Sequence, residues 1–348
     1  MTTGPQVRRA LVKSAVGAAR FRLTGRRVPL AVTLLLTRRC DSSCATCGLP
    51  QVTRPELETA EVLAMIDHLA VLGTTRVNLT GGEPLVRADL GAIVDRCAEH
   101  GMWTVLDTNG HALPERVGEL GRLTKVMVGL HGPPEVHDHL TEPGAHARVL
   151  AGLAAARTAG LRVGTVTVLC KSTIGAVEWV LQHAEAHGHG AVFQVAQAQG
   201  GLASRAARRQ LAPADVLREA LGGLMAAKAA GRPVDMSERV LRYLRAWPDY
   251  GASTYPMPHD DLRCMAGQVS CVVDADGGVY GCVPRIDGRA AHNVRDHGFD
   301  VAFAGLRDPG CQACTDTACA EANFLYNLDK PAVIEVARVG ARTLWSPP

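Results

Sequence analysis

The stretch Leu30-Ala-Val-Thr-Leu-Leu-Leu-Thr37, followed by Cys40-Asp-Ser-Ser-Cys44-Ala-Thr-Cys47, determines the fold expected for this 348-residue chain. The first part is a continuous apolar run with the length of a buried strand. The second part places three cysteines directly behind it in a C-x3-C-x2-C spacing. Parallel α/β folds carry their chemistry on the loops that follow the strands. We therefore expect the three cysteines to lie in a functional loop at the end of a central strand.

Three cysteines without a local fourth favour one kind of metal site. Three thiolates can hold three irons of a [4Fe–4S] cluster and leave the fourth iron free, whereas a closed zinc or iron–sulfur site takes four ligands. The spacing therefore suggests a cluster that binds a further molecule at its open iron. A zinc knuckle or a chance grouping is the alternative.

Beyond the cysteine loop, apolar strand patterns alternate with amphipathic helix patterns. Further strands are expected at residues 76–80, 103–107, 125–130, 161–169 and 191–195. Helices are expected at residues 59–72, with Thr59 as the N-cap, and at 88–100, 114–120, 147–159 and 174–186. Repeated strand–helix units require right-handed parallel crossovers. The pattern predicts an α/β fold, an open or partial (β/α)6 barrel.

Two short motifs stand at the ends of neighbouring strands. Gly81-Gly82-Glu83-Pro84 follows the strand at 76–80, and Thr108-Asn109-Gly110 follows the strand at 103–107. Glycines let the backbone approach a ligand closely, and a carboxylate can hold an ammonium group. Taken alone, each motif has a structural alternative. The first could be a Gly-Gly turn with a capping glutamate, and the second could be an Asn-Gly turn.

Together, the cysteine loop and the Gly-Gly-Glu-Pro motif at this separation resemble the radical S-adenosylmethionine (radical SAM) superfamily. The resemblance implies that Cys40, Cys44 and Cys47 hold a [4Fe–4S] cluster whose free iron binds SAM. It implies that Gly81, Gly82 and Glu83 contact the methionine amine and that Thr108 and Asn109 lie near the ribose. It further implies reductive cleavage of SAM to a 5′-deoxyadenosyl radical, which abstracts a substrate hydrogen.

The chain departs from the family pattern at several positions. Thr46 stands before the third cysteine, where relatives usually have an aromatic residue. At the end of the fourth strand, relatives with cysteine-rich extensions commonly show Ser-Leu-Asp-Gly, and this chain has Gly129 for the serine and His131 for the aspartate. Thr141 stands near an expected arginine, and Arg148 is a candidate substitute for SAM carboxylate contacts.

Two residues at strand ends are candidate catalytic groups. His131 could accept the proton that a substrate radical loses in an oxidation, hydrogen-bond SAM, or pack structurally. Cys170 ends the fifth strand and could donate a hydrogen atom to a substrate radical. A small buried structural cysteine is the common alternative.

The second cysteine-rich region spans Cys264 to Cys319. Residues 271–282 have the pattern of a β-hairpin with an Asp-Gly turn, and Cys311-x2-Cys314 follows. This region resembles the twitch or SPASM extensions of radical SAM enzymes, which hold auxiliary [4Fe–4S] clusters. The resemblance implies one auxiliary cluster on Cys264, Cys282, Cys311 and Cys314, with Cys271 and Cys319 as spare or alternative ligands. A structural zinc on the same four residues is the alternative.

We expect five segments along the chain. These are a basic amphipathic N-terminal helix (1–29), the radical SAM partial barrel (30–198), a helical connector (199–260), a small cysteine-rich twitch/SPASM-like domain (261–325) and a C-terminal helix or tail (326–348). Residues 1–27 contain seven basic residues and no acid. The other 321 residues therefore have a net charge of about −4, which is seven less than the net charge of +3 of the whole chain. The N-terminal helix at residues 8–23 either contacts anionic lipid or an acidic partner, or closes the bottom of the main domain.

The composition is that of a soluble globular protein, 47% hydrophobic and 20% charged, without an apolar run of 18 residues. We expect a cytoplasmic enzyme with SAM, a SAM-binding [4Fe–4S] cluster and an auxiliary [4Fe–4S] cluster. We expect a low-potential electron donor (flavodoxin or ferredoxin) as a partner, and we expect no binding to nucleic acid. Because only 29 residues precede the barrel, a small-molecule or lipid-like substrate is favoured over a peptide. The alternatives are a ribosomal-peptide maturase, with Cys170 as hydrogen donor, and a non-enzymatic electron-transfer or sensor protein.

Overall fold

Strand β1 (Ala31–Leu35) is the apolar run that precedes the three cysteines, and it pairs in parallel with β2 (Arg76–Thr80). The computed structural model describes residues 4–49, 53–197, 207–286, 288, 292–306 and 310–335. The next strands continue the parallel sheet in chain order: β3 (Trp103–Thr108), β4 (Lys125–Gly129), β5 (Val163–Leu169) and β6 (Gly190–Val195). The expected partial (β/α)6 barrel is therefore confirmed.

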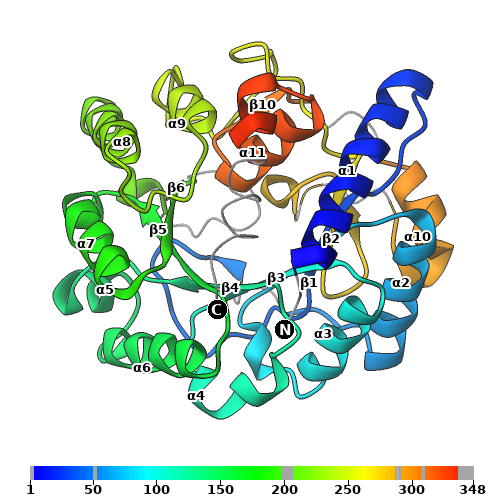
Figure 1. Ribbon diagram of the computed structural model, residues 1–348, viewed down its shortest axis with the longest axis horizontal. Helices are drawn as coiled ribbons and strands as arrows, with labels where there is room; N and C mark the ends of the chain where they lie inside the picture. The colour runs from blue at the N-terminus through cyan, green and yellow to red at the C-terminus, as the bar shows by residue number, and fades with distance from the viewer. Residues whose placement is uncertain are drawn as a thin grey trace.

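Helices cover the outer face of this curved sheet (Figure 1). They are α2 (Thr59–Leu72), α3 (Leu90–Glu99), α4 (Leu113–Arg116), α5 (Pro134–Leu140), α6 (Ala145–Thr158) and α7 (Val177–His187). Helix α2 has the predicted bounds, but its N-cap is Glu58, not Thr59, because Glu58 and Glu61 form a reciprocal capping box. Alternate residues of β1 and β2, such as Val32, Leu34 and Leu79, pack with α2 and α3 in the main core.

The cysteine-rich hairpin is joined to the barrel sheet. Strand β8 (Ser270–Val273) pairs in parallel with β1, and β9 (Val279–Tyr280) pairs antiparallel with β8 through the expected Asp-Gly turn, in which Gly277 has φ +89°. The result is an eight-stranded sheet of order β6-β5-β4-β3-β2-β1-β8-β9. A boundary at residue 261 remains a prediction, but the hairpin extends the main sheet and does not stand apart from it.

The remaining elements lie near the open side of the barrel. The connector contains α8 (Ala214–Ala229) and α9 (Glu238–Arg245), while its start at 198–206 lies outside the described residues. Strands β7 (Thr254–Tyr255) and β10 (Ala313–Cys314) form a small antiparallel pair, and α10 (Val294–Ala304) and α11 (Thr317–Tyr326) follow β9. In Figure 1, α11 in red lies between α9 and the N-terminal helix α1 (Gly4–Thr24) in blue. Of the expected C-terminal segment, residues 336–348 lie outside the described residues.

The N-terminal helix contains the predicted span 8–23, and part of it packs against the body of the protein. Ala18 and Phe21 contact Leu30, Met265 and other buried residues. The side chains of residues 1–9 and 11 lie outside the described ones. Among the helices that the structure describes, none is long and apolar enough to cross a bilayer.

Candidate functional site

The buried carboxylate of Glu83 brings three of the predicted motifs together. Thr108 donates its hydroxyl to Glu83 Oε1 at 2.7 Å, and the Asn109 backbone N–H donates to Oε2 at 2.7 Å. The Asn109 side-chain amide donates to Asp41, inside the cysteine loop, at 2.6 Å. The cysteine loop, the Gly-Gly-Glu motif and the Thr-Asn-Gly motif thus meet where β1, β2 and β3 end.

The two glycines of the motif are required by backbone packing. A Cβ atom on Gly81 would lie 2.3 Å from the carbonyl oxygen of Thr37, and one on Gly82 would lie 2.2 Å from that of Arg39. Gly82 N–H donates to Thr37 O, and Glu83 N–H donates to Arg39 O. The sequence suggested close approach to a ligand. In the structure, the approach is to the base of the cysteine loop.

Gly82→Ala is therefore expected to destabilise the protein by about 1–3 kcal/mol, since the methyl group cannot fit without moving the loop backbone. Gly118→Ala is the matched control, because a Cβ there meets nothing within 4 Å. Urea unfolding measures both variants. Equal stability of the two would show that the loop base shifts freely.

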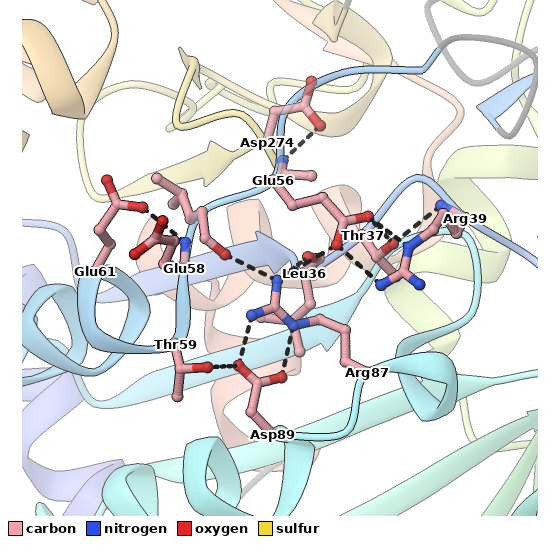
Figure 2. A network of polar contacts seen from close by, with 12 residues as sticks. Leu36, Thr37, Arg39, Glu56, Glu58, Thr59, Glu61, Arg87, Asp89 and Asp274 are labelled. Carbon is pink, nitrogen blue, oxygen red and sulfur yellow. Dashed lines mark hydrogen bonds and ion pairs between the residues drawn. The ribbon is translucent and has the colours of Figure 1, made fainter.

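A polar network fixes the loop base to its neighbours (Figure 2). Thr37 and Arg39 both bond Glu56, and Arg87 donates to the Leu36 carbonyl at 2.8 Å. Arg87 is itself held by Asp89. Because these groups come from the segment after β1, the segment before α2 and the segment before α3, the loop begins from a rigid platform.

The three thiols of the loop are suited to bind a metal cluster. Burial raises the pKa of Cys40 to about 12 and also raises the pKa values of Cys44 and Cys47. The charge of Cys44 adds to the pKa shift of Cys40, and the charge of Cys47 adds to the pKa shift of Cys44. A metal ligand must be a thiolate, and a bound metal supplies the counter-charge for a buried thiolate. The donor set therefore fits the expected cluster, and these ligands remain a prediction.

Glu83 should make the stability of the SAM-free protein depend on pH. Burial raises its pKa from 4.5 to about 7, although three hydrogen bonds oppose the shift. The folded protein therefore keeps a proton up to about pH 7 that the unfolded chain releases near 4.5, so stability falls as pH rises through this window. Glu83→Gln cannot lose this proton. Urea unfolding at pH 5 and pH 7 should show a flatter dependence for the variant, even if it is less stable throughout, and equal slopes would contradict the assignment.

The structure buries both candidate catalytic residues. The His131 ring stacks on His137 at 5.2 Å, and its Nδ1 accepts the Val168 backbone N–H. Burial, helped by His137, lowers the pKa of His131 to about 3, so the imidazole is a weak proton acceptor. Cys170 is 0% exposed and lies 3.4 Å from the Thr173 hydroxyl. Both roles stay predictions, and both side chains are buried in this structure.

Arg148 lies closer to the cysteine loop than its place in the sequence suggested. It forms an ion pair with Glu142, whose other oxygen accepts the Ser43 hydroxyl of the loop at 3.4 Å. Arg148 thus stands on the rim beside the cysteines and remains a candidate for the SAM carboxylate.

The C-terminal cysteines form a second group. The charges of Cys264, Cys311 and Cys314 all act on the buried Cys282 thiol, and together with burial they raise its pKa. A hydrogen bond between Cys319 and Cys314 raises the pKa of Cys319, so this supposed spare cysteine belongs to the group. Cys271 does not, because it is buried in the main core. Within the described ranges, no three His, Cys, Asp or Glu side chains are grouped to bind a single metal ion. The cysteine sulfurs that bind a four-iron cluster lie farther apart than the ligands of a single metal ion.

Sequence reasoning missed a polar pair inside the barrel. Asn78 on β2 donates to Asp107 Oδ2 on β3 at 2.7 Å. Their strand neighbours Leu79 and Leu106 lie in the core, so the pair points to the opposite, inner face. Burial raises the pKa of Asp107, and the hydrogen bond from Asn78 partly opposes this shift. The charge of Asp316, which lies beside the second cysteine group, raises the pKa further. An aspartate within the apolar strand Trp103–Thr108 was the available signal.

Comparison with known proteins agrees with this arrangement. Residues 34–183 match the sequence model of the radical SAM superfamily. A parallel barrel, a rim loop of three cysteines and a buried glutamate at the next strand define the same class, and the chain is a radical SAM enzyme. The family uses a [4Fe–4S] cluster and SAM, so both cofactor expectations are confirmed for the barrel.

The relatives differ in how much of the chain they match. Mycofactocin maturase MftC of Mycobacterium ulcerans is 28% identical over 316 residues, which are 83% of this chain and 81% of that protein. GTP 3′,8-cyclase of Streptomyces coelicolor is 39% identical over 146 residues, 39% of this chain and 43% of that enzyme. The chain thus spans less than half the length of this cyclase.

Solved structures share the fold at low sequence identity. Streptococcus suis SuiB bound to S-adenosylmethionine has a TM-score of 0.64 at 14% identity, over 84% of this chain and 69% of that one. The structure of anSMEcpe with bound AdoMet and Cp18Cys peptide has a TM-score of 0.61 at 15% identity, over 89% and 99%.

Proposed function

We propose that this radical SAM enzyme modifies a peptide and carries an auxiliary [4Fe–4S] cluster on its C-terminal cysteines. The observation that carries the proposal is the extent of the likeness to a maturase. It covers 83% of this chain, and the cysteine-rich hairpin is part of the barrel sheet through β8 and β1. The fold is also shared with SuiB bound to precursor peptide SuiA and with peptide-bound anSMEcpe.

The small-molecule expectation rested on the short segment before residue 30, and the relatives favour the peptide alternative. A partner that donates low-potential electrons belongs to the proposal, as the superfamily generally needs one.

Each part of the site has a role in the proposal. When bound at Cys40, Cys44 and Cys47, the cluster supplies the electron that cleaves SAM. In this proposal Glu83 and the Asn109 region hold the amine and ribose side of SAM, and Arg148 is the candidate for its carboxylate. Asp107 and Asn78 face the inner side of the barrel, where they can bind N–H groups of the substrate. Four of the five grouped C-terminal cysteines would close the auxiliary cluster.

Anaerobically reconstituted enzyme, mixed with SAM, reductant and peptides encoded beside its gene, tests the proposal. A mass change in one peptide, read by tandem mass spectrometry, is the expected result. If no peptide changes while a metabolite stimulates 5′-deoxyadenosine formation and is itself altered, the small-molecule alternative is correct.

The same assay separates the candidate residues. Asp107→Asn should reduce peptide product at least 10-fold while 5′-deoxyadenosine still forms, because SAM cleavage needs no substrate contact there. Cys170→Ala should leave the product intact. A loss confined to the Cys170 variant, with solvent deuterium in the wild-type product, would instead indicate a hydrogen-atom donor and epimerisation.

A further inference from the structure

The outward face of α1 presents an apolar stripe between basic side chains. Val12, Val16 and Leu23 are 57%, 63% and 86% exposed, while Ala18 and Phe21 turn inward. Helical spacing puts Lys13 and Arg20 along one side of this stripe and Arg22 along the other. The sequence suggested a choice between a surface contact and a structural closure. The inward face packs on the body of the protein, and the outward face is exposed.

The basic side chains of this face are available for a partner. Lys13, Arg20, Arg22, Arg26 and Arg263 are exposed. Arg22 donates one hydrogen bond to the Asn327 carbonyl, and in the part of the chain that the structure describes none of the five forms an ion pair. Arg27 differs, because its guanidinium is used on carbonyls such as those of Gly267 and Leu306. Two exposed acids lie near Arg263 in sequence, Asp260 and Asp261, and Asp260 is paired with Arg239.

A hollow beside this face is lined in part by Arg263, the residue that precedes Cys264. A cavity of about 340 Å³ lies between α1 and the segment at 263–268, lined by Phe21, Arg22, Arg263, Met265, Gln268 and Asn327. Arg263 immediately precedes Cys264, one of the grouped cysteines, and the Asn327 amide donates to the Arg263 carbonyl at 2.7 Å. A molecule seated over Arg22 and Arg263 would therefore lie next to the cysteine group.

We propose that this face, formed by Val16, Leu23, Arg22 and Arg263, docks an acidic electron-carrier protein that contains a flavin or an iron–sulfur centre. Protein interfaces combine an apolar centre with a charged rim, and complementary charge speeds encounter and fixes orientation. Docked there, the reduced carrier would give one electron to an auxiliary cluster held by the grouped cysteines, so the carrier would be oxidised and the cluster reduced, and no bond would be made or broken. This step rests on the auxiliary cluster of the proposed function.

The same charge could attract an anionic bilayer, but the apolar stripe is poorly suited to one. Helices that lie in a membrane interface carry large residues such as Trp, Phe and Leu on the apolar face. Here the exposed stripe consists of two valines and a leucine with alanines, and Phe21 is buried. The cavity also makes the surface concave. These features favour a protein partner.

Titration of the reconstituted holoenzyme with oxidised flavodoxin, an acidic FMN protein, tests the proposal. The double variant Arg22→Glu/Arg263→Glu should bind at least 10-fold more weakly than wild type, and wild-type binding should weaken steeply with salt. Arg162→Glu/Arg245→Glu is the control, since it changes the same net charge at exposed arginines elsewhere. Iron content should be equal in all three proteins. With dithionite as a small reductant, 5′-deoxyadenosine formation by the test variant should stay unchanged.

Equal binding by the two double variants would overturn the docking site. So would binding of wild type to phosphatidylglycerol vesicles with no affinity for flavodoxin, which would assign the face to lipid. Peptide modification that proceeds with dithionite despite absent carrier binding refutes the docking site and leaves the proposed function standing. Carrier binding that falls only in the test variant supports the docking site even if no peptide is modified.

Discussion

Replacing Cys40, Cys44 and Cys47 together with alanine is expected to remove about half of the iron from anaerobically reconstituted protein. Wild type should hold about eight irons, four for each of two clusters, and the variant about four. The loop that carries these cysteines starts from a base fixed by Glu56 and Arg87, so the barrel should remain folded without its cluster. Iron analysis together with circular dichroism measures both effects.

The matched control for this loss is Cys271→Ala. Cys271 lies in the apolar core away from both cysteine groups, so its replacement should leave all of the iron in place. An unchanged iron content in the triple variant would show that the loop is not a cluster site. Zinc in place of the remaining iron would instead show that the second cysteine group is a structural zinc site.

Asp274→Ala is expected to cost about 3–5 kcal/mol of stability, because it removes the carboxylate that pairs with the buried Arg38 guanidinium. The two side chains are 0% and 3% exposed, and Arg38 donates to both carboxylate oxygens, at 2.5 and 3.2 Å. Arg38 belongs to the segment that leads into the cysteine loop, and Asp274 follows β8. The pair therefore ties the cysteine-rich hairpin to the base of the SAM site, and urea unfolding should show its loss directly.

Asp300→Ala provides the comparison, since it also removes an ion-paired aspartate. Asp300 bonds His68 at 2.8 Å, but the pair is 63% and 42% exposed, and such pairs contribute about 0–1 kcal/mol. Similar small losses in both variants would mean that water reaches Arg38 and that the hairpin is held by its strand pairing alone.

The barrel could be predicted from the sequence because local signals agree with the final packing there. The apolar run before Cys40 and the strand at Arg76–Thr80 have their residues buried as their patterns require. The pairing of β8 with β1 could not be predicted, because a four-residue strand carries no signal for its partner 239 residues away. Helix α10 was missed for a similar reason, since Gly298 interrupts its pattern with φ +73°.

The candidate site also has features that could be predicted from the sequence and features that could not. Its motifs could be found because each follows a strand end, and parallel strand ends meet at one edge of the sheet. The reason for Gly81 and Gly82 could not be found, because it depends on the approach of Thr37 and Arg39 from the segment that follows β1. The burial of His131 and Cys170 depends on α5 and on the segment around Thr173, which the strand pattern did not describe.

Formation of 5′-deoxyadenosine tests the central claim most directly. Anaerobically reconstituted wild type with SAM and dithionite should release it, as measured by liquid chromatography and mass spectrometry. The Cys40→Ala/Cys44→Ala/Cys47→Ala variant should release none above the enzyme-free background, while Cys271→Ala should match wild type. Equal release by the triple variant and wild type would contradict the assignment of this loop as the site of radical SAM chemistry.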